Sequence, residues 1–391
     1  MPPTVLITKR IFPSTVAFLK EHTEIDYEDS AEGLTSPQLI ERARGKRVLI
    51  SQFTDPLPRD VIAQLKGLGM IAHIGVGFDN IDLQAATENG ILVSNTPGVL
   101  NDTTADFAFS LLMAASRRLA EADTFVRSGQ WKKWSLDMLA GMDIHHRTLG
   151  IIGMGRIGQE MARRGQGFSM RVLYNNRTQL PPEREKELNA TWVSKEQLLR
   201  ESDFVSLHCP LNDSTRHLMK EADFRLMKPT AIFVNTARGP VVDEEALVKA
   251  LEERWIAGAG LDVFETEPLP PSSPLWDMPN VVMTPHIAGH LGNGFRRQGR
   301  LTCQEIERFL SGKPALHEVR EEDLSRENSA LKSRIAALAP GRTTQSAPVV
   351  STAGAAIPMT RRSAESELRR HGNSPVRTTR PPDRRRCRRA R

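Results

Sequence analysis

The sequence predicts an α/β protein with two Rossmann-like domains, each built on a parallel, doubly wound sheet. Three observations predict this fold class. At 391 residues the chain exceeds the roughly 100 to 200 residues of one typical domain. Short apolar segments of strand length alternate with helix-like segments between residues 4 and 283, as in parallel sheets. Finally, Gly153-x-Gly155-x-x-Gly158 joins an apolar strand to a polar, helix-prone segment, as in a dinucleotide-binding βαβ unit.

The first 100 residues predict a small α/β domain. Strand signals occupy residues 4–7, 48–51 and 71–76, and residues 37–43 are helix-like. The third strand opens a glycine-flanked turn from Gly75 to Asn80, and Pro97-Gly98 marks the end of the region.

A helix that is apolar almost all round is predicted for residues 103–119. Such a helix must be buried, either inside the protein or at a subunit interface. The loop Gln130-Trp131-Lys132-Lys133-Trp134 follows it. Its tryptophans either pack on a surface or interface, or form one wall of a substrate cleft.

Six strands are predicted for the second sheet, at residues 149–152, 170–174, 204–208, 231–234, 258–263 and 281–283. Ser194 and Asp243 stand where they would cap the intervening helices. In the glycine turn, Gly153 allows a sharp bend, Gly155 lets a pyrophosphate approach the backbone, and Gly158 lets the helix pack closely. The helix N-terminus would then offer unpaired N–H groups to the phosphates.

Ligands of such sheets bind outside the carboxyl ends of the strands, and Arg238, Glu267 and His286 each follow a different strand there. Arginine can bind a carboxylate through two parallel hydrogen bonds. Histidine exchanges protons near neutral pH, and a neighbouring carboxylate raises its pKa and fixes its tautomer. The three residues together predict hydride transfer between a nicotinamide and a carbonyl or alcohol.

Each of these residues also has a purely structural interpretation. Arg238 could form a surface ion pair, Glu267 could be a solvated loop carboxylate, and His286 could pack after a cis or strained Pro285. His290 is a second candidate for the acid/base, although it lies further beyond the strand end.

The net charge of +6 belongs to the C-terminal part of the chain. Residues 321–391 contain 16 Lys and Arg against 7 Asp and Glu, a net of +9, whereas the preceding residues contain 37 against 40, a net of −3. Because Pro, Ser, Thr, Ala and Arg dominate from about Ser329, we predict that residues 321–391 form a basic, disordered tail. We expect it to be an inert, solvated segment rather than one that binds nucleic acid or another acidic partner.

The composition also bears on location. No apolar run approaches the roughly 18 residues of a membrane span, and no basic segment precedes an apolar one at the N-terminus, so neither an anchor nor a signal peptide is expected. Cys209, Cys303 and Cys387 lie far apart and are odd in number. They predict a reducing, cytoplasmic setting, no disulfide framework and no metal site.

Four stretches resemble the signatures of the D-isomer-specific 2-hydroxyacid dehydrogenases. They are residues 153–158 (GMGRIG), 235–243 (NTARGPVVD), 260–268 (GLDVFETEP) and 285–289 (PHIAG). The resemblance extends over about residues 4–320. Within the family, residues 143–150 and 173–177 are most similar to the glyoxylate/hydroxypyruvate and 2-ketogluconate reductases.

The resemblance implies a domain organisation. Residues 1–100 and 290–320 would form the substrate (catalytic) domain, and residues 101–289 would form an NAD(P)-binding Rossmann domain inserted within it. Closure of the two domains would exclude water from the hydride path. The family also implies a homodimer with the helix at 103–119 in its interface.

The resemblance further implies a role for each site residue. Arg238 would hold the carboxylate and carbonyl of the substrate, His286 would protonate the carbonyl oxygen, and Glu267 would pair with His286. Val76 and Gly77 would bind the substrate carboxylate through their N–H groups. The cofactor contacts would be Thr104, Gly153, Gly155, Arg156, Ile157, Gly158, Asn176, Arg177, Thr178, Cys209, Pro210, Thr236, Ala237, Asp262 and Gly289.

The choice between the two nicotinamide cofactors depends on the segment after the second strand. An NAD site places a carboxylate there to bind the ribose 2′-OH, whereas an NADP site places an arginine there. This chain has Asn175-Asn176-Arg177-Thr178, with an arginine and no carboxylate. The segment predicts NADPH, with NADH as the second option.

The sequence therefore predicts an NADPH-dependent reductase of a small 2-oxoacid, glyoxylate or hydroxypyruvate first. The alternatives within the family are 2-ketogluconate reduction and oxidation of phosphoglycerate or phosphonate. A more distant alternative is a non-catalytic protein that senses a dinucleotide and acts through its basic tail. The tail and residues 290–294 depart from the family pattern.

Overall fold

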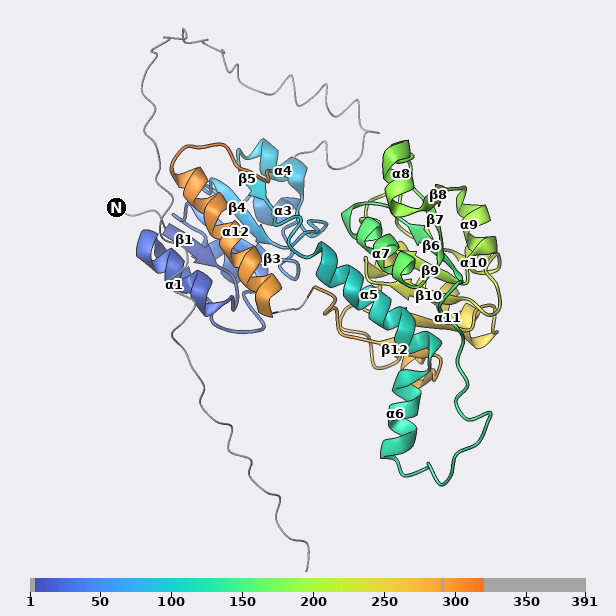
Figure 1. Cartoon of the computed structure of the whole chain (residues 1–391). Helices are drawn as coiled ribbons and strands as arrows, with labels where there is room; N and C mark the ends of the chain where they lie inside the picture. Colours follow the sequence, from blue (N-terminus) through green and yellow to red (C-terminus); the bar gives the residue numbers. More distant parts are fainter. Residues whose placement is uncertain (1–3, 290–291, 320–391) are drawn as a thin grey trace, which may run out of the picture. The chain divides into compact units, whose positions relative to one another are not determined.

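The computed structural model describes residues 4–289 and 292–319, which form two parallel sheets with helices on both faces (Figure 1). The predicted basic tail and His290 lie outside these residues. No helix of the described ranges is both long and apolar enough to cross a membrane.

The first sheet has five strands in the order β2-β1-β3-β4-β5. They are β1 (Thr4–Ile7), β2 (Glu24–Tyr27), β3 (Val48–Gln52), β4 (Met70–Ile74) and β5 (Leu92–Ser94). The predicted strands at residues 4–7 and 48–51 are confirmed, and the third ends two residues earlier than predicted. The sequence analysis missed β2 and β5 because neither contains a run of three apolar residues, and β2 carries the charged residues Glu24 and Asp26.

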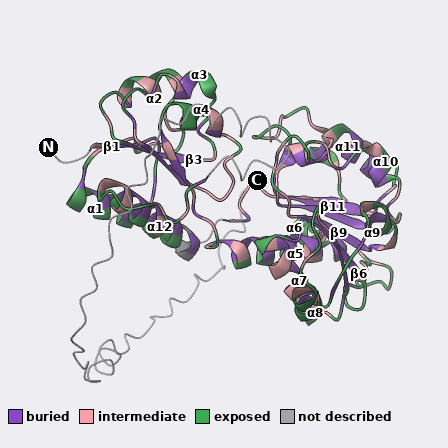
Figure 2. Cartoon of the chain, turned by 90° about the horizontal axis from the view of Figure 1, so that it is seen from above, coloured by how far each residue is buried: buried purple, intermediate pink, exposed green. Residues whose placement is uncertain are grey.

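Helices lie on both faces of the first sheet (Figure 2), and alternate strand residues pack against the two layers. Leu6 and Leu49 pack under α2 (Ser36–Arg42), α3 (Arg59–Ile62) and α4 (Leu83–Glu88). Val5 and Ile7 face α1 (Pro13–His22) and α12 (Gly292–Leu310). Figure 1 shows α12 beside α1 on this sheet, although residues 23–291 separate the two helices in the sequence.

The second sheet has seven strands in the order β12-β11-β10-β9-β6-β7-β8, where six were predicted. They are β6 (Thr148–Ile152), β7 (Arg171–Asn175), β8 (Ala190–Trp192), β9 (Phe204–Leu207), β10 (Ile232–Asn235), β11 (Gly258–Leu261) and β12 (Val281–Met283). The missed strand is β8, an edge strand of three residues, Ala190–Trp192, whose Thr191 and Trp192 are exposed and which has no continuous apolar run. All pairings are parallel, which confirms the doubly wound α/β class.

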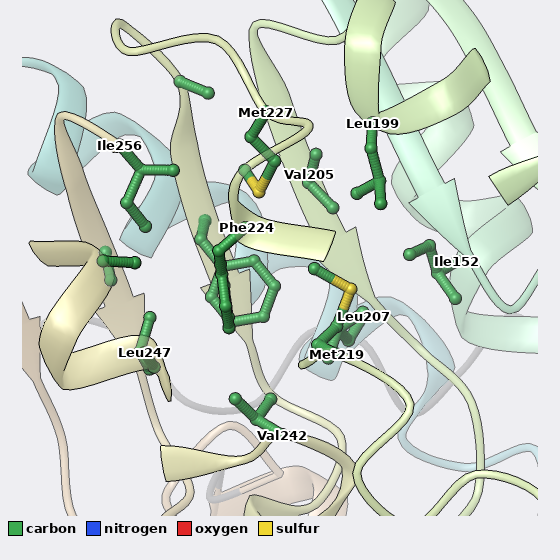
Figure 3. Close-up of a cluster of buried hydrophobic side chains, with 14 of the residues drawn as sticks. Ile152, Leu199, Val205, Leu207, Met219, Phe224, Met227, Val242, Leu247 and Ile256 are labelled. Atoms are coloured by element: carbon green, nitrogen blue, oxygen red, sulfur yellow. The ribbon is translucent and has the colours of Figure 1, made fainter. Parts of the chain in front are cut away.

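The second sheet also has helices on both faces. One face is covered by α9 (Lys195–Glu201), α10 (Glu221–Phe224) and α11 (Glu244–Glu252), around Phe224 at the middle of the cluster in Figure 3. The other face is covered by α5 (Asn101–Ser116) and α7 (Arg156–Gly167), and α8 (Pro182–Leu188) follows β7. Ser194 caps α9 by accepting from the Gln197 N–H, and Asp243 caps α11 by accepting from the Ala246 N–H.

The predicted helix at residues 103–119 corresponds to α5, and a second helix that was not predicted follows it. α5 ends at Ser116, and α6 (Leu119–Arg127) starts after Arg118, whose φ of 54° breaks the helix. The apolar side of α5 is buried against the sheet and α7 of the same chain. By contrast, α6 has no buried residue.

Candidate active site

The glycine turn between β6 and α7 has the geometry that its sequence predicts. Gly153 has a φ of +98°, and a Cβ at this position would lie 2.6 Å from the backbone nitrogen of Cys209. A Cβ on Gly158 would overlap the carbonyl oxygen of Gly153. Gly155, in contrast, has open space where its Cβ would be, so a bulky group can approach the backbone at the N-terminus of α7.

The segment after β7 is braced by the neighbouring edge strand. The Trp192 indole Nε1 donates to the Asn176 carbonyl at 3.1 Å, and the Asn176 side chain donates to the Thr178 carbonyl at 3.2 Å. Arg177 is exposed, and none of the ion pairs found within residues 4–289 and 292–319 involves it. Its guanidinium is therefore available to an anion.

Arg238 lies in a turn that the side chain of Asn235, the last residue of β10, holds in shape. The Asn235 amide accepts from the Ala237 N–H and donates to the Arg238 carbonyl, each at 3.0 Å. The guanidinium Nε donates to Asp79 at 2.9 Å, and Nη1 donates to the Ala237 carbonyl at 2.9 Å. A Cβ on Gly77 would overlap Nη2, so glycine at this position lets the first sheet approach the arginine.

His286 and Glu267 form a hydrogen-bonded pair, with 2.7 Å between His286 Nδ1 and Glu267 Oε2. Glu267 Oε1 also accepts from the Phe264 N–H at 3.0 Å. Burial raises the pKa of Glu267, but the His286 hydrogen bond and charge, with the Phe264 N–H, outweigh it and place the pKa below its usual value. An ionised Glu267 assigns the proton of the pair to Nδ1, which leaves Nε2 for the substrate.

A buried carboxylate fixes the turn that carries His286. Asp262 accepts from the Thr284 hydroxyl at 2.7 Å and from the Ile287 and Ala288 N–H groups at 2.8 Å each. The His286 N–H donates to the Asp262 carbonyl at 2.8 Å, and His286 has a φ of 55°. Asp262 therefore ties the imidazole to the end of β11, and its implied contact with the cofactor stays a prediction.

Pro285 does not follow a cis peptide bond; among the described residues the cis bond is Glu267–Pro268. The purely structural interpretation, in which His286 packs after a cis or strained Pro285, therefore cannot rest on a cis bond at this position. The Phe53 ring lies 4.6 Å from the His286 ring and forms one side of its surroundings.

The turn after β4 rests on a buried histidine. His73 is bonded to the Ser51 hydroxyl at 3.0 Å, and burial lowers its pKa to about 4, so it is neutral at pH 7. A Cβ on Gly75 would lie 2.5 Å from His73 Nε2. None of the backbone hydrogen bonds of the described residues uses the N–H of Val76 or Gly77, so both groups are available to a ligand.

One cleft of about 1130 Å³ collects residues from the carboxyl ends of both sheets. The predicted site residues that line it are Val76, Gly77, Thr104, Arg156, Ile157, Cys209, Pro210, Thr236, Ala237, Arg238, His286 and Gly289. The predicted residues outside its lining are Gly153, Gly155, Gly158, Asn176, Arg177, Thr178, Asp262 and Glu267. Among the described residues, no three His, Cys, Asp or Glu side chains are grouped as metal ligands.

The sequence analysis missed several residues of this cleft. Lys9 and Phe53 follow the strands β1 and β3, so the strand-end rule could have found both. Asp79 stands in the glycine-flanked turn itself. His317, by contrast, comes from the segment after α12, and no local pattern indicates that this segment returns to the cleft.

The second sheet is seven-stranded and doubly wound, with an open glycine turn. An arginine and a Glu–His pair lie at its strand ends. This arrangement is the one expected of a nicotinamide-dependent dehydrogenase. Residues 109–288 match the family described as D-isomer specific 2-hydroxyacid dehydrogenase, NAD binding domain. A glyoxylate reductase of Korarchaeum cryptofilum is 48% identical over 313 residues, which are 80% of this chain and 94% of that protein. The chain therefore belongs to the D-isomer specific 2-hydroxyacid dehydrogenase family.

Two solved structures are similar over nearly their full length. A glyoxylate reductase from Paecilomyes thermophila has a TM-score of 0.74 and 35% identity, covering 82% of this chain and 100% of that chain. An NADPH-dependent glyoxylate/hydroxypyruvate reductase from Sinorhizobium meliloti, in complex with NADP and malonate, has a TM-score of 0.74 and 31% identity, covering 82% and 98%. The chain is thus an NAD(P)-dependent D-2-hydroxyacid dehydrogenase of the glyoxylate reductase type.

Proposed function

We propose that the protein uses NADPH to reduce glyoxylate to glycolate, which is achiral, or hydroxypyruvate to D-glycerate. The observation that carries the proposal is the presence of Arg238 and the His286–Glu267 pair at one cleft, with the free N–H groups of Val76 and Gly77. The similar glyoxylate reductases support this substrate class.

The residues of the glycine turn fit a dinucleotide, because Gly155 leaves the backbone open at the N-terminus of α7. When bound there, NADPH supplies the hydride that the carbonyl carbon receives. Arg238 and the N–H groups of Val76 and Gly77 bind the substrate carboxylate and orient the carbonyl. The imidazolium of His286 gives its Nε2 proton to the carbonyl oxygen, and Glu267 stabilises the imidazolium before this transfer.

The proposed preference for NADPH rests on Arg177, which is exposed and has no ion-pair partner among the described residues, and on the absence of a carboxylate in Asn175–Thr178. Arg177 can bind a 2′-phosphate, whereas no acidic group is present to bind the ribose 2′-OH of NADH. Arg177→Ala should raise the KM for NADPH by about tenfold and leave the KM for NADH unchanged, because one charge-assisted contact is lost.

A spectrophotometric panel measures this prediction and the substrate together. NADPH and NADH are each tested with glyoxylate, hydroxypyruvate, 2-ketogluconate and pyruvate, and with 3-phosphoglycerate and a phosphonate in the oxidative direction. A kcat/KM about tenfold or more higher with NADH would overturn the cofactor proposal. If 2-ketogluconate or a phosphorylated substrate gave the highest kcat/KM, that family member would replace the proposed one. Absence of turnover with every compound would favour the non-catalytic dinucleotide sensor.

We also propose a homodimer, formed through α6 and the loop that follows it. Leu119, Val126, Trp131, Trp134 and Leu136 are more than half exposed there, which is unusual for large apolar side chains. The contact surface would thus be α6 rather than α5, which is buried within its own chain. Sedimentation should give twice the chain mass, and Val126→Asp combined with Trp134→Asp should give a monomer. A wild-type monomer at micromolar concentration would contradict the proposal.

The domain boundaries and the location remain proposals. Packing of α12 on β4 and α1 supports one substrate domain made from residues 1–100 and 290–320, with residues 101–289 inserted as the cofactor domain. The free thiols of Cys209 and Cys303 support a cytoplasmic location.

A further inference from the structure

A carboxylate from the turn after β4 contacts the arginine that follows β10. Asp79 Oδ1 accepts a hydrogen bond from Arg238 Nε at 2.9 Å, between residues 159 positions apart in the sequence. The two side chains are mostly buried, with exposed fractions of 30% for Asp79 and 23% for Arg238. None of the roles assigned above uses Asp79.

This contact completes the restraint on the guanidinium. Nε donates to Asp79 and Nη1 donates to the Ala237 carbonyl. Nη2 occupies the space that a Cβ on Gly77 would take. A guanidinium is planar with five N–H groups, so fixing Nε and one Nη1 hydrogen fixes the direction of the others. The remaining N–H groups keep one orientation at the cleft.

Asp79 is held in place by the next residue in the chain, Asn80. The Asn80 side chain donates to the Gln52 carbonyl at 3.1 Å and to the Asp55 carbonyl at 2.8 Å. The Asn80 carbonyl accepts from the Leu57 N–H at 2.9 Å. Asp79 therefore stands on backbone tied to the segment after β3, which a residue that positions another side chain requires.

The charge of Asp79 has the wrong sign for attracting the substrate. A 2-oxoacid is an anion, and a carboxylate in the lining of its cleft repels it. Attraction of the substrate therefore gives no reason for an aspartate here, whereas its ion pair and hydrogen bond with Arg238 Nε do. The geometry also explains why an acceptor must stand there, because an unrestrained arginine side chain has many rotamers.

We propose that Asp79 is a positioning residue, which orients the Arg238 guanidinium toward the substrate and acts through its oxygen acceptor rather than through its charge. This inference rests on the proposed function, in which Arg238 binds the carboxylate of the 2-oxoacid. Asp79 thereby links the substrate-binding turn after β4 to the catalytic turn after β10.

Two substitutions in the full chain separate geometry from charge. Asp79→Ala removes the acceptor and should lower kcat/KM for glyoxylate by about 10-fold to 100-fold, mainly through a higher KM, with the KM for NADPH within about twofold of wild type. Asp79→Asn keeps an oxygen at the same place without the charge and should stay within about threefold of wild type. Asp60→Ala is the matched control, because it removes an exposed carboxylate on α3, which packs on the first sheet. Its kcat/KM should equal that of wild type.

The proposal is overturned if Asp79→Ala stays within threefold of wild type, or if Asp79→Asn loses as much as Asp79→Ala. It also requires coupling to the arginine. Added to Arg238→Lys, which has no Nε–H to donate, Asp79→Ala should cost less than about twofold more. A full additional loss in that background would show that Asp79 acts independently of Arg238.

Calorimetric binding of oxalate to the NADPH-saturated protein gives a measurement besides turnover. Two results together support both proposals: the wild-type protein turns over glyoxylate, and Asp79→Ala binds oxalate about tenfold more weakly than wild type. The same drop with no turnover by wild type would overturn the proposed reaction and keep the role of Asp79. Turnover by wild type with unchanged oxalate affinity in Asp79→Ala would overturn the role of Asp79 alone.

Discussion

Substitution of His286 by alanine is expected to lower kcat for glyoxylate reduction by about 10²-fold to 10⁴-fold, the usual contribution of general acid catalysis. Of the His286–Glu267 pair, His286 lines the cleft. Asp262 holds the turn that carries His286 in place. The affinity for NADPH, measured by fluorescence titration, should stay within about twofold, because the glycine turn belongs to a different strand end.

The backbone at His286 sets the choice of control. Its φ of 55° is unfavourable for alanine, whereas asparagine adopts left-handed backbone more readily. His286→Asn should therefore lose as much activity as His286→Ala with a smaller loss of thermal stability. Retention of more than about a tenth of wild-type kcat by both variants would show that His286 is not the acid.

Substitution of Gly77 by alanine is expected to be the second most damaging change, with a loss of about 100-fold in kcat/KM for glyoxylate. The new Cβ would overlap Arg238 Nη2, and the end of a flexible side chain yields more easily than backbone. The guanidinium would be displaced from the substrate, while the fold would remain. Steady-state kinetics with glyoxylate and a thermal melt measure the two effects separately.

Gly167→Ala is the matched control for this substitution. Gly167 is the last residue of α7, and a Cβ there would meet nothing within 4 Å. Alanine favours helix over glycine by up to about 1 kcal/mol, so this variant should be as active as wild type and equally or more stable. Equal activity of Gly77→Ala and Gly167→Ala would contradict the role given to the space at Gly77.

The sequence predicted the parts of the fold that depend on local pattern. The glycine turn could be predicted because its glycines have steric reasons that the sequence pattern reveals. A Cβ on Gly153 or Gly158 would overlap backbone atoms. The strands β2, β5 and β8 could not be predicted, because none of them contains the run of three apolar residues that marks the equally short β1 and β12. The sequence analysis also missed α6, and it ended the preceding helix at residue 119 rather than at Ser116, since Arg118 carries no sequence signal for a positive φ.

The candidate site was predictable to the extent that strand ends locate it. The strand-end rule placed Arg238 and His286 at one edge of the sheet, and both line the same cleft. The contact of Asp79 with Arg238 spans 159 positions and two sheets, so no spacing along the chain could indicate it. The hydrogen bonds of Asp262 to the His286 turn were missed for the same reason, because they depend on tertiary packing.

The return of α12 to the first sheet has a consequence for synthesis. Val5 and Ile7 are covered on one face by Cys303 and Ile306 of α12, which are made about 300 residues later in the chain. Ribosomes add about 5 to 20 residues per second, so roughly 15 to 60 seconds separate these strands from their cover. During this time α1 alone is available to cover this apolar sheet face, and contact with other nascent chains competes with folding where α12 will pack. This face of the first sheet is therefore completed only after α12 has been made.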